Sequence, residues 1–276
     1  MLGDLHCHTR LSDGSSTIDD LVFYAKRGGL DFVAITDHDT MAGATRAAVL
    51  GKRYGIKVVP GAELSAYDTA RKRRVHILCY LPQKPERLLG ICTKVIESRT
   101  LAGQEMLKRV MRYYPVTPEH VSRYSAGSKA LYKAHIMNAI IDLGYSDRIY
   151  GPLYDDLFDS WQGSCYVEVT YPDVRHVLDV VHSAGGLAVL AHPAEYDSFD
   201  LLEELCGKNL LEGVECSHPR CSPQDQQRIT EIADHYGLIK TGGTDFHGFY
   251  ARDPHPLGSF LTQPEEIDKL YKLAKK

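Results

Sequence analysis

The sequence predicts an α/β fold in which helices cover a largely parallel sheet or barrel, with an α-helical segment inserted near the middle of the chain. Short aliphatic runs alternate with helix-like patterns in the first and last thirds. Several of these runs end in His, Asp or Glu, and the strand ends are where parallel α/β barrels build their sites. Between about residues 83 and 163 the Val/Ile-rich runs fade and helical periodicity replaces them.

The first third alternates strand and helix signals. Thr17 or Ser16 can cap a helix whose first turn carries Asp19 and Asp20, and Gly28 stops it. Gly55 ends a second helix in the same way. The expected strands span 2–8, 32–36, 57–60 and 75–80, and the expected helices span about 17–28 and 42–54.

The last third repeats this pattern, with mostly aliphatic strands that are typical of a buried parallel sheet. Gly185 and Gly237 follow the two helical stretches as stop signals. The expected helices span 174–184 and 223–236, and the expected strands span 187–191, 213–216 and 239–241.

The middle of the chain is predicted to be helical. Pro82 and Pro85 mark its start, and helical periodicity covers 88–113, 129–143 and 153–161. We therefore expect residues 1–82 and 164–276 to form the barrel, and residues 83–163 to form an insertion that caps the site.

Composition limits the classes of function. A length of 276 residues allows one large domain, or one domain with an insertion. Of the residues in the chain, 43% are hydrophobic and 25% charged, which is usual for a globular protein. Its net charge of −4 counts against a protein that coats nucleic acid. Because apolar runs long enough to cross a bilayer are missing from the sequence, we expect neither a membrane span nor, from composition, a protein partner.

The cysteines indicate a reducing compartment. There are seven, an odd number, scattered along the chain without a CxxC pair. Such cysteines are typical of reduced, mostly buried thiols. The first candidate ligand lies at residue 6, so a cleaved leader would remove it; we therefore expect a mature N-terminus and a cytoplasmic protein.

His6 and His8 are the strongest candidates for metal ligands. Because they alternate with Leu5 and Cys7 in an expected strand, both imidazoles point to one face. Two histidines on one face at a strand end make half a metal site. The other candidates are Asp13 and, after later strands, Asp37, His38, Glu63, His76, His192, Asp245 and His247.

Each of these residues taken singly is more simply explained as a hydrogen-bonded core or loop residue. The set is harder to explain in that way, because many of the 13 histidines fall at expected strand ends beside carboxylates. Metal sites gather these residue types, so the pattern as a whole favours a metal centre.

The motifs together resemble those of the PHP (polymerase and histidinol phosphatase) family of metal-dependent phosphoesterases, which implies a distorted (β/α)7 barrel. The motifs that carry the resemblance, in order, are Asp4-Leu5-His6-Cys7-His8, Ser12-Asp13-Gly14, Ile35-Thr36-Asp37-His38-Asp39, Pro60-Gly61-Ala62-Glu63, Val75-His76-Ile77-Leu78, Leu190-Ala191-His192-Pro193 and Gly242-Gly243-Thr244-Asp245-Phe246-His247-Gly248.

The resemblance implies two or three divalent ions. One set of ligands would be His6, His8, Glu63 and Asp245; a second would share Glu63 and add His76 and His192; a third would be Asp13, His38 and His247. Mixed nitrogen and oxygen ligands suit Mn, Fe or Zn, and Asp13 makes Mg acceptable at the third position. Ions that bridge a water would generate the hydroxide that attacks phosphorus, so the ligands Glu63, Asp245 and His38 are also candidate catalytic residues. Asp37 is a candidate for orienting an imidazole from behind.

Within the family, the likeness is to small phosphoesterases with a helical insertion, and it is carried by Lys133-Ala134-His135-Ile136 and Leu143-Gly144-Tyr145. It implies a phosphatase that removes the 3′-phosphate of nucleoside 3′,5′-bisphosphates. The alternatives are a 5′→3′ exoribonuclease on short RNA and a histidinol-phosphate phosphatase. A non-enzymatic role would need lost ligands, and the sequence retains all of them.

Cations near the expected cap are candidates for binding substrate phosphate, since charge-assisted bonds to phosphate are strong. They are Arg99, Lys129, Lys133, His135 and Arg175. His218 follows a strand; it could donate a proton to the leaving group, or it could be structural. The run from Arg71 to Arg74 is interpreted first as a solvated turn, with a basic rim as the alternative.

Overall fold

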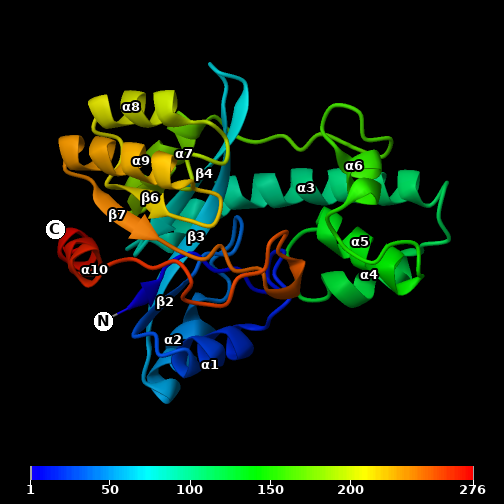
Figure 1. The fold of residues 1–276 in the computed structure, drawn as a ribbon, viewed down its shortest axis with the longest axis horizontal. Coiled ribbons are helices and arrows are strands. Elements are labelled where there is room, and N and C mark those ends of the chain that lie inside the picture. Colours follow the sequence, from blue (N-terminus) through cyan, green and yellow to red (C-terminus); the bar gives the residue numbers. More distant parts are fainter. Residues whose placement is uncertain (1, 276) are drawn as a thin grey trace.

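Seven strands follow one another around the sheet in chain order (Figure 1). The computed structural model describes residues 2–275. The backbone amide of Leu5, just after the first strand, donates to the carbonyl of Gly242 in the last, at 3.2 Å. This contact nearly closes the sheet into the predicted barrel. The strands are β1 (Gly3–Asp4), β2 (Phe32–Ile35), β3 (Lys57–Asp68), β4 (Arg73–Tyr80), β5 (Leu187–Leu190), β6 (Gly213–Ser217) and β7 (Ile239–Gly242).

One strand, β4, departs from the parallel arrangement that the sequence predicts, and β3 departs from its expected length. β4 runs antiparallel to both β3 and β5. β3 is also much longer than the expected 57–60, because it continues directly into a hairpin with β4 through a turn at residues 69–72. A short turn can join only antiparallel strands, since a parallel pair needs a crossover. Glu63 and His76 therefore lie within strands, and the prediction that they lie at strand ends is wrong.

Helices cover the outside of the sheet (Figure 1). Thr17 and Asp20 form a reciprocal capping box at the start of the first helix, as the sequence predicts. The helix 199–207 was missed, and so was the C-terminal helix, whose Ile267 and Leu270 pack against the barrel interior. These outer helices are α1 (Ile18–Arg27), α2 (Ala44–Tyr54), α7 (Val174–Ser183), α8 (Phe199–Gly207), α9 (Pro223–Tyr236) and α10 (Pro264–Leu273).

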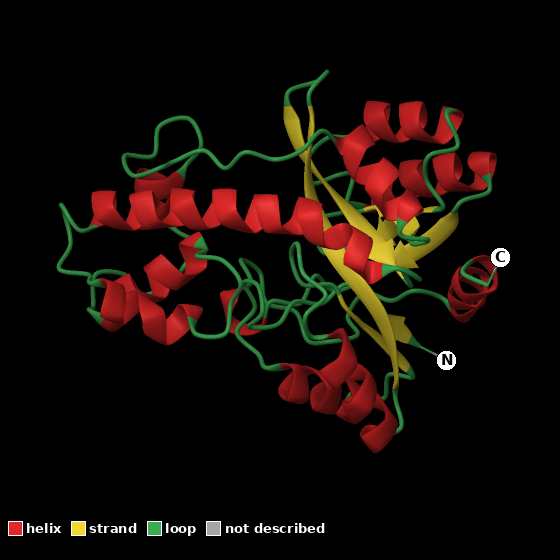
Figure 2. Ribbon diagram, turned by 180° about the vertical axis from the view of Figure 1, so that it is seen from behind, coloured by secondary structure: helices red, strands yellow, loops and turns green. Residues whose placement is uncertain are grey.

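The insertion consists of helices that extend to one side of the barrel, as Figure 2 shows from behind. A 3-10 turn, η1 (Pro85–Leu88), leads into the long helix α3 (Leu89–Val110), and α4 (Pro118–Ser125), α5 (Lys133–Asp142) and α6 (Pro152–Phe158) follow. The sequence interpretation missed α4. Within residues 2–275, none of the helices is long and apolar enough to cross a membrane.

α3 ties the insertion to the barrel because its two ends belong to different cores. Ile91 near its start packs in the core between the sheet and α7, whereas Met106 and Val110 pack in a separate core of the insertion. Gly103, between these two ends of α3, lets the backbone at Leu131 approach the helix closely, because a Cβ at this position would lie 2.5 Å from the carbonyl oxygen of Leu131. The segment before α5 is thereby held against α3, facing the barrel.

Candidate metal centre and its cavity

The first ligand group joins three parts of the chain around one carboxylate. The Nε2 atoms of His6 and His8 lie 3.2 and 3.1 Å from Oε2 of Glu63. Asp245, just after β7, approaches the same nitrogens, with Oδ1 3.2 Å from Nε2 of His8. The four side chains offer ligand atoms that all lie within 4.8 Å of one another.

The second group uses the other oxygen of Glu63. Its Oε1 lies 2.7 Å from Nδ1 of His76 on β4 and 2.9 Å from Nε2 of His192 after β5. His76 and His192 are themselves 3.3 Å apart through these nitrogens. Glu63 thus faces both groups, one carboxylate oxygen to each, which is the geometry of a bridging ligand.

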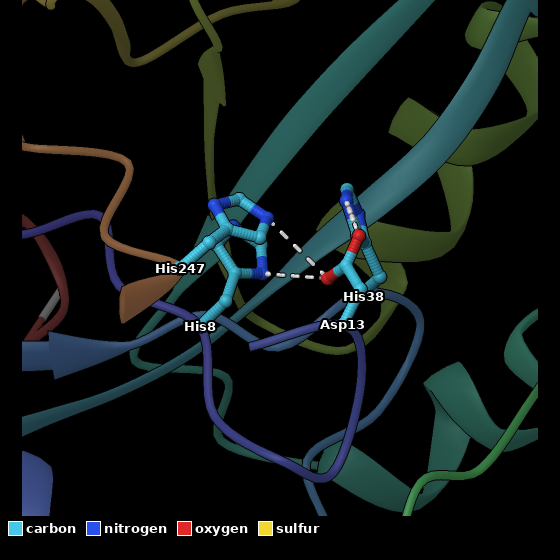
Figure 3. A group of neighbouring side chains, drawn as sticks. All are labelled: His8, Asp13, His38 and His247. Carbon is cyan, nitrogen blue, oxygen red and sulfur yellow. Dashed lines mark ion pairs between the residues drawn. The ribbon is translucent and has the colours of Figure 1, made fainter. Parts of the chain in front are cut away.

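The third group surrounds Asp13 (Figure 3). Its Oδ1 lies 3.4 Å from Nε2 of His247 and 3.8 Å from Nδ1 of His8, and its Oδ2 lies 3.7 Å from Nε2 of His38. Nδ1 of His38 lies 3.2 Å from Oε2 of Glu63, so His38 spans the gap between the third group and the first. The structure therefore brings together all nine side chains of the three ligand sets that the family resemblance implies.

The donor atoms fit divalent ions. Several buried nitrogens in the cluster have no hydrogen-bond partner among residues 2–275, including Nε2 of His6, Nε2 of His8 and Nδ1 of His38. Buried polar atoms without partners are rare in proteins, and a bound cation would satisfy these. Mixed imidazole and carboxylate donors suit Mn, Fe or Zn.

The carboxylates of the cluster stay ionised. Burial by itself raises the pKa of Glu63, but the imidazoles of His76 and His38 hold it well below its ordinary value. Burial opposes ionisation of Asp13 in the same way, and His38 and His247 lower its pKa. Around His247, burial lowers the imidazole pKa, but Asp13 and Asp245 outweigh it and raise the pKa to about 10. Anionic oxygens are the form that binds metals.

Tight packing positions Asp245. Gly243 lies so close to His6 that a Cβ on it would be 2.3 Å from the Cβ of His6. Asp4 then accepts hydrogen bonds from the backbone amide and the hydroxyl of Thr244, at 2.9 and 2.6 Å. Asp245 itself has a left-handed φ of 49°, a conformation that costs energy in a non-glycine residue and gathers at functional sites.

Asp37 lies behind the ligand groups and contacts them only indirectly. It accepts hydrogen bonds from the amide and hydroxyl of Thr9 and from the hydroxyl of Ser12, each at 2.7 Å. Ser12 Oγ in turn lies 3.5 Å from Nδ1 of His8. Asp37 therefore reaches an imidazole through Ser12, and it fixes the loop that carries Asp13.

A cavity of about 490 Å³ opens over the cluster. Its floor holds Glu63, His76, His192 and Asp245, and the insertion supplies much of the opposite wall. Cations and tyrosines dominate the rest of the lining, namely Arg74, Arg99, Lys133, Arg220, Arg252, Tyr132, Tyr150, Tyr154, Tyr166, Tyr171, Tyr196 and Tyr250.

Only some of the candidate substrate residues reach this cavity. Arg99 and Lys133 line it, whereas the other three are absent from the lining that residues 2–275 provide. Lys129 is exposed, and His135 is fully buried beneath Tyr132. Arg175 is engaged with Glu204 and Asp68. The structure thus places Lys129, His135 and Arg175 away from the substrate space.

The two cations from the insertion differ in how they are held. Nη2 of Arg99 donates to Ser65 Oγ at 2.8 Å, and its guanidinium lies 4.9 Å from the centroid of Tyr132. Lys133 donates to the carbonyl of Phe158 at 3.0 Å. Burial lowers the pKa of Lys133 to about 8, with Arg74 and Arg99 adding to the effect. Like charges that face one cavity make a site for an anion.

Arg74 is a cavity residue that the sequence interpretation assigned to a solvated turn. Arg71 and Arg73 are half-buried and form ion pairs with Asp200 outside the cavity, whereas Arg74 is more exposed and lines the cavity. Arg74 follows Arg73 on β4, and successive residues of a strand face opposite sides. The spacing of the run along a strand was therefore the signal that could have separated Arg74 from its neighbours.

Glu215 was also missed. It lies within β6, is 1% exposed and contacts Nδ1 of His6 at 3.0 Å. The available signal was an acidic residue inside an otherwise apolar strand, since a buried carboxylate needs partners. His218, three residues after Glu215, also lies at the site, because its Nε2 is 3.5 Å from Oδ2 of Asp245.

Comparison with known proteins agrees with this geometry. The family model described as "PHP domain" matches residues 4–170 of the chain. A protein of Bifidobacterium adolescentis described as a candidate metal-dependent phosphoesterase has a similar solved structure, with a TM-score of 0.88 and 28% identity, covering 98% of this chain and 96% of its own.

Three curated relatives match over most of their length. The phosphoribosyl 1,2-cyclic phosphate 1,2-diphosphodiesterase of Eggerthella lenta is 40% identical, covering 92% of this chain and 97% of its own. The 3′,5′-nucleoside bisphosphate phosphatase of Chromobacterium violaceum is 25% identical, covering 88% and 86%. The 5′-3′ exoribonuclease of Haemophilus influenzae is also 25% identical, covering 88% and 89%. The chain belongs to the PHP family, and it is a metal-dependent phosphoesterase that acts on phosphate esters.

Proposed function

We propose that this enzyme hydrolyses a phosphate ester of a small phosphorylated sugar, with phosphoribosyl 1,2-cyclic phosphate as the first candidate substrate. The observation that carries the proposal is the cavity of about 490 Å³ over the ligand groups, which is lined by metal-ligand candidates and by cations. Such a space matches a small ligand with a reacting phosphate at one end and a further anionic group at the other. The 40% identity to the Eggerthella lenta enzyme over nearly its whole length supports this choice.

A nucleoside 3′,5′-bisphosphate, the substrate that the sequence suggests first, is the second candidate. The tyrosines of the cavity wall favour it, because aromatic rings such as Tyr154 and Tyr166 offer faces on which a base can stack. The relative with that activity is only 25% identical, which is why we place this substrate second.

The residues have separable tasks in either reaction. The three ligand groups would hold divalent ions, which when bound would supply Lewis-acid stabilisation of phosphate oxygens and lower the pKa of water. The spacing of the ligand groups is fixed by three side chains that lie between them, namely Glu63, Asp245 and His38. Arg99, Lys133 and Arg74 bind the anionic parts of the substrate through charge-assisted hydrogen bonds.

His218 is the candidate that stabilises the leaving oxygen. Its Nδ1 accepts a hydrogen bond from the backbone amide of Arg220 at 3.2 Å. In the neutral imidazole the proton is therefore on Nε2, which faces Asp245 and lines the cavity. That arrangement lets Nε2 donate a hydrogen bond that stabilises the leaving oxygen as the ester bond breaks, while water supplies the proton that this oxygen takes up.

A side-by-side assay tests the proposal. Protein loaded with Mn would be given phosphoribosyl 1,2-cyclic phosphate, a nucleoside 3′,5′-bisphosphate, histidinol phosphate and a short 5′-phosphorylated RNA at matched concentrations. We expect the highest kcat/KM for the cyclic phosphate, with the bisphosphate next. A clear preference for RNA would replace this proposal by the exoribonuclease, and a preference for histidinol phosphate would exclude a second anionic group as a requirement.

A further inference from the structure

Glu215 connects two ligand groups from behind. Its side chain is buried between β6 and the cluster. Oε1 and Oε2 lie 3.0 and 3.2 Å from Nδ1 of His6, a ligand of the first group. Oε2 also accepts the backbone amide of His192, a ligand of the second group, at 3.0 Å. A single carboxylate thus contacts both groups without facing the cavity, whose lining omits it.

The contact with His6 fixes the form of that imidazole. An ionised carboxylate only accepts hydrogen bonds, so the nitrogen beside it must carry the proton. Nδ1 of His6 therefore donates to Glu215, and in the neutral imidazole Nε2 keeps its lone pair. Nε2 is the atom that points to Glu63 and Asp245, at 3.2 and 3.5 Å. Carboxylates that hold ligand imidazoles in this way also raise their basicity toward a metal.

The contact with His192 fixes a strained backbone. His192 has a φ of 27°, a left-handed value that non-glycine residues adopt only when their surroundings enforce it. The hydrogen bond from its amide to Glu215 is one such constraint. The imidazoles of His192 and His6 also stack, with centroids 5.7 Å apart and planes at 17°. The two ligands are therefore held relative to each other by the same carboxylate.

We infer that Glu215 is a positioning residue that sets the spacing and metal affinity of the first and second ligand groups together. The inference rests on the proposed metal centre, and it is independent of which phosphate ester is the substrate. Loss of Glu215 therefore weakens ions in both groups, although Glu215 itself ligates neither.

The test compares Glu215→Gln with Glu212→Gln. The first change keeps the shape but replaces one acceptor oxygen by a donor, so either His6 or His192 loses its partner. Glu212 is a matched control three positions earlier: its carboxylate lies 3.4 Å from Nε2 of His182 and accepts the amide of Ala188 at 2.7 Å, away from the ligand groups. Metal-free protein would be titrated with Mn by calorimetry, and the melting temperature of the metal-free protein would be measured alongside.

We expect Glu215→Gln to raise the Kd for Mn by roughly 10- to 100-fold, the usual loss when the partner of a ligand imidazole is removed, and Glu212→Gln to leave it unchanged. An unchanged Kd for Glu215→Gln, with only the melting temperature lowered, would overturn the inference and leave the phosphoesterase proposal intact. Should that variant fail to fold, nitrogen NMR of histidine-labelled wild-type protein decides: the inference requires a proton on Nδ1 of His6 with and without metal, and an Nδ1 that carries no proton in either state contradicts it.

Discussion

Oε1 of Glu63 on β3 lies 2.7 Å from Nδ1 of His76 on β4, across an antiparallel hairpin. In the register of that hairpin Glu63 is opposite Leu78, so the pair meets diagonally on one face of the sheet. The rigid pairing of the two strands holds the second ligand group, and it leaves the other oxygen of Glu63 free to face His6 and His8.

This arrangement predicts a large effect of Glu63→Gln. The amide can no longer offer two anionic oxygens, so both ligand groups are weakened at once. We expect kcat to fall by at least about 10²–10³-fold, the loss typical for one preorganised group at a reaction centre. His182→Gln is the control, because that imidazole pairs with Glu212 away from the ligand groups. Near-normal turnover of Glu63→Gln, with metal bound, would contradict the assignment of the bridging ligand.

Arg74→Ala should weaken the binding of substrates that carry a second anionic group and leave other substrates unaffected. We expect KM for a substrate with a second anionic group to rise by roughly 10- to 100-fold, equivalent to about 1.5–3 kcal/mol of charge-assisted hydrogen bonding. Turnover of p-nitrophenyl phosphate should hardly change, since it lacks that group. Arg73→Ala is the matched control, as Arg73 pairs with Asp200 outside the cavity. Equal losses on both substrates would mean that Arg74 supports the fold.

Lys133 predicts a pH dependence of substrate binding. Its pKa is lowered to about 8, chiefly by burial, and the ammonium form is present below that value. KM for a substrate with a second anionic group should therefore be low below pH 8 and should rise as pH increases through it. In Lys133→Arg, whose guanidinium stays charged, this rise should disappear. Identical pH profiles of KM for the two proteins would exclude Lys133 from substrate binding.

Tyr132→Phe should weaken binding without harming the fold. The hydroxyl of Tyr132 is buried and has no hydrogen-bond partner within residues 2–275, although the residue lines the cavity. Removing an unsatisfied buried group should leave the melting temperature unchanged or raise it. If the hydroxyl donates to a bound phosphate, KM should rise roughly tenfold, which corresponds to a loss of ~1.5 kcal/mol of binding free energy. A lowered melting temperature with unchanged KM would show that the hydroxyl is structural.

The candidate ligands could be picked out from the sequence because each lies in a short motif beside an aliphatic run, as with His6 and His8. The same local patterns predicted the other helices around the barrel, but not α8 (Phe199–Gly207) or α10 (Pro264–Leu273). The reversed direction of β4 was not predictable in this way, because a strand pattern is identical in either direction. The length of β3 likewise depends on its pairing with β4, which is a tertiary effect.

The cavity wall was less predictable for a physical reason. His135 and Lys133 both lie in α5, yet only Lys133 reaches the cavity, and that difference depends on how the helix packs against α3. Arg74, on strand β4 of the barrel, lines the same cavity, and only the folded arrangement of the barrel and the insertion brings it there. The contacts of Glu215 could not be predicted from local patterns, because its two partners, His6 and His192, are distant in the chain.

Metal reconstitution tests the central claim most directly. Protein stripped with a chelator would be titrated with Mn while bound metal and phosphate-ester hydrolysis are measured on the same samples. The ligand groups predict about two or three equivalents bound per chain, with activity that is absent in the stripped protein and returns as the sites fill. Full hydrolytic activity in metal-free protein, or no metal bound at saturation, would contradict the account.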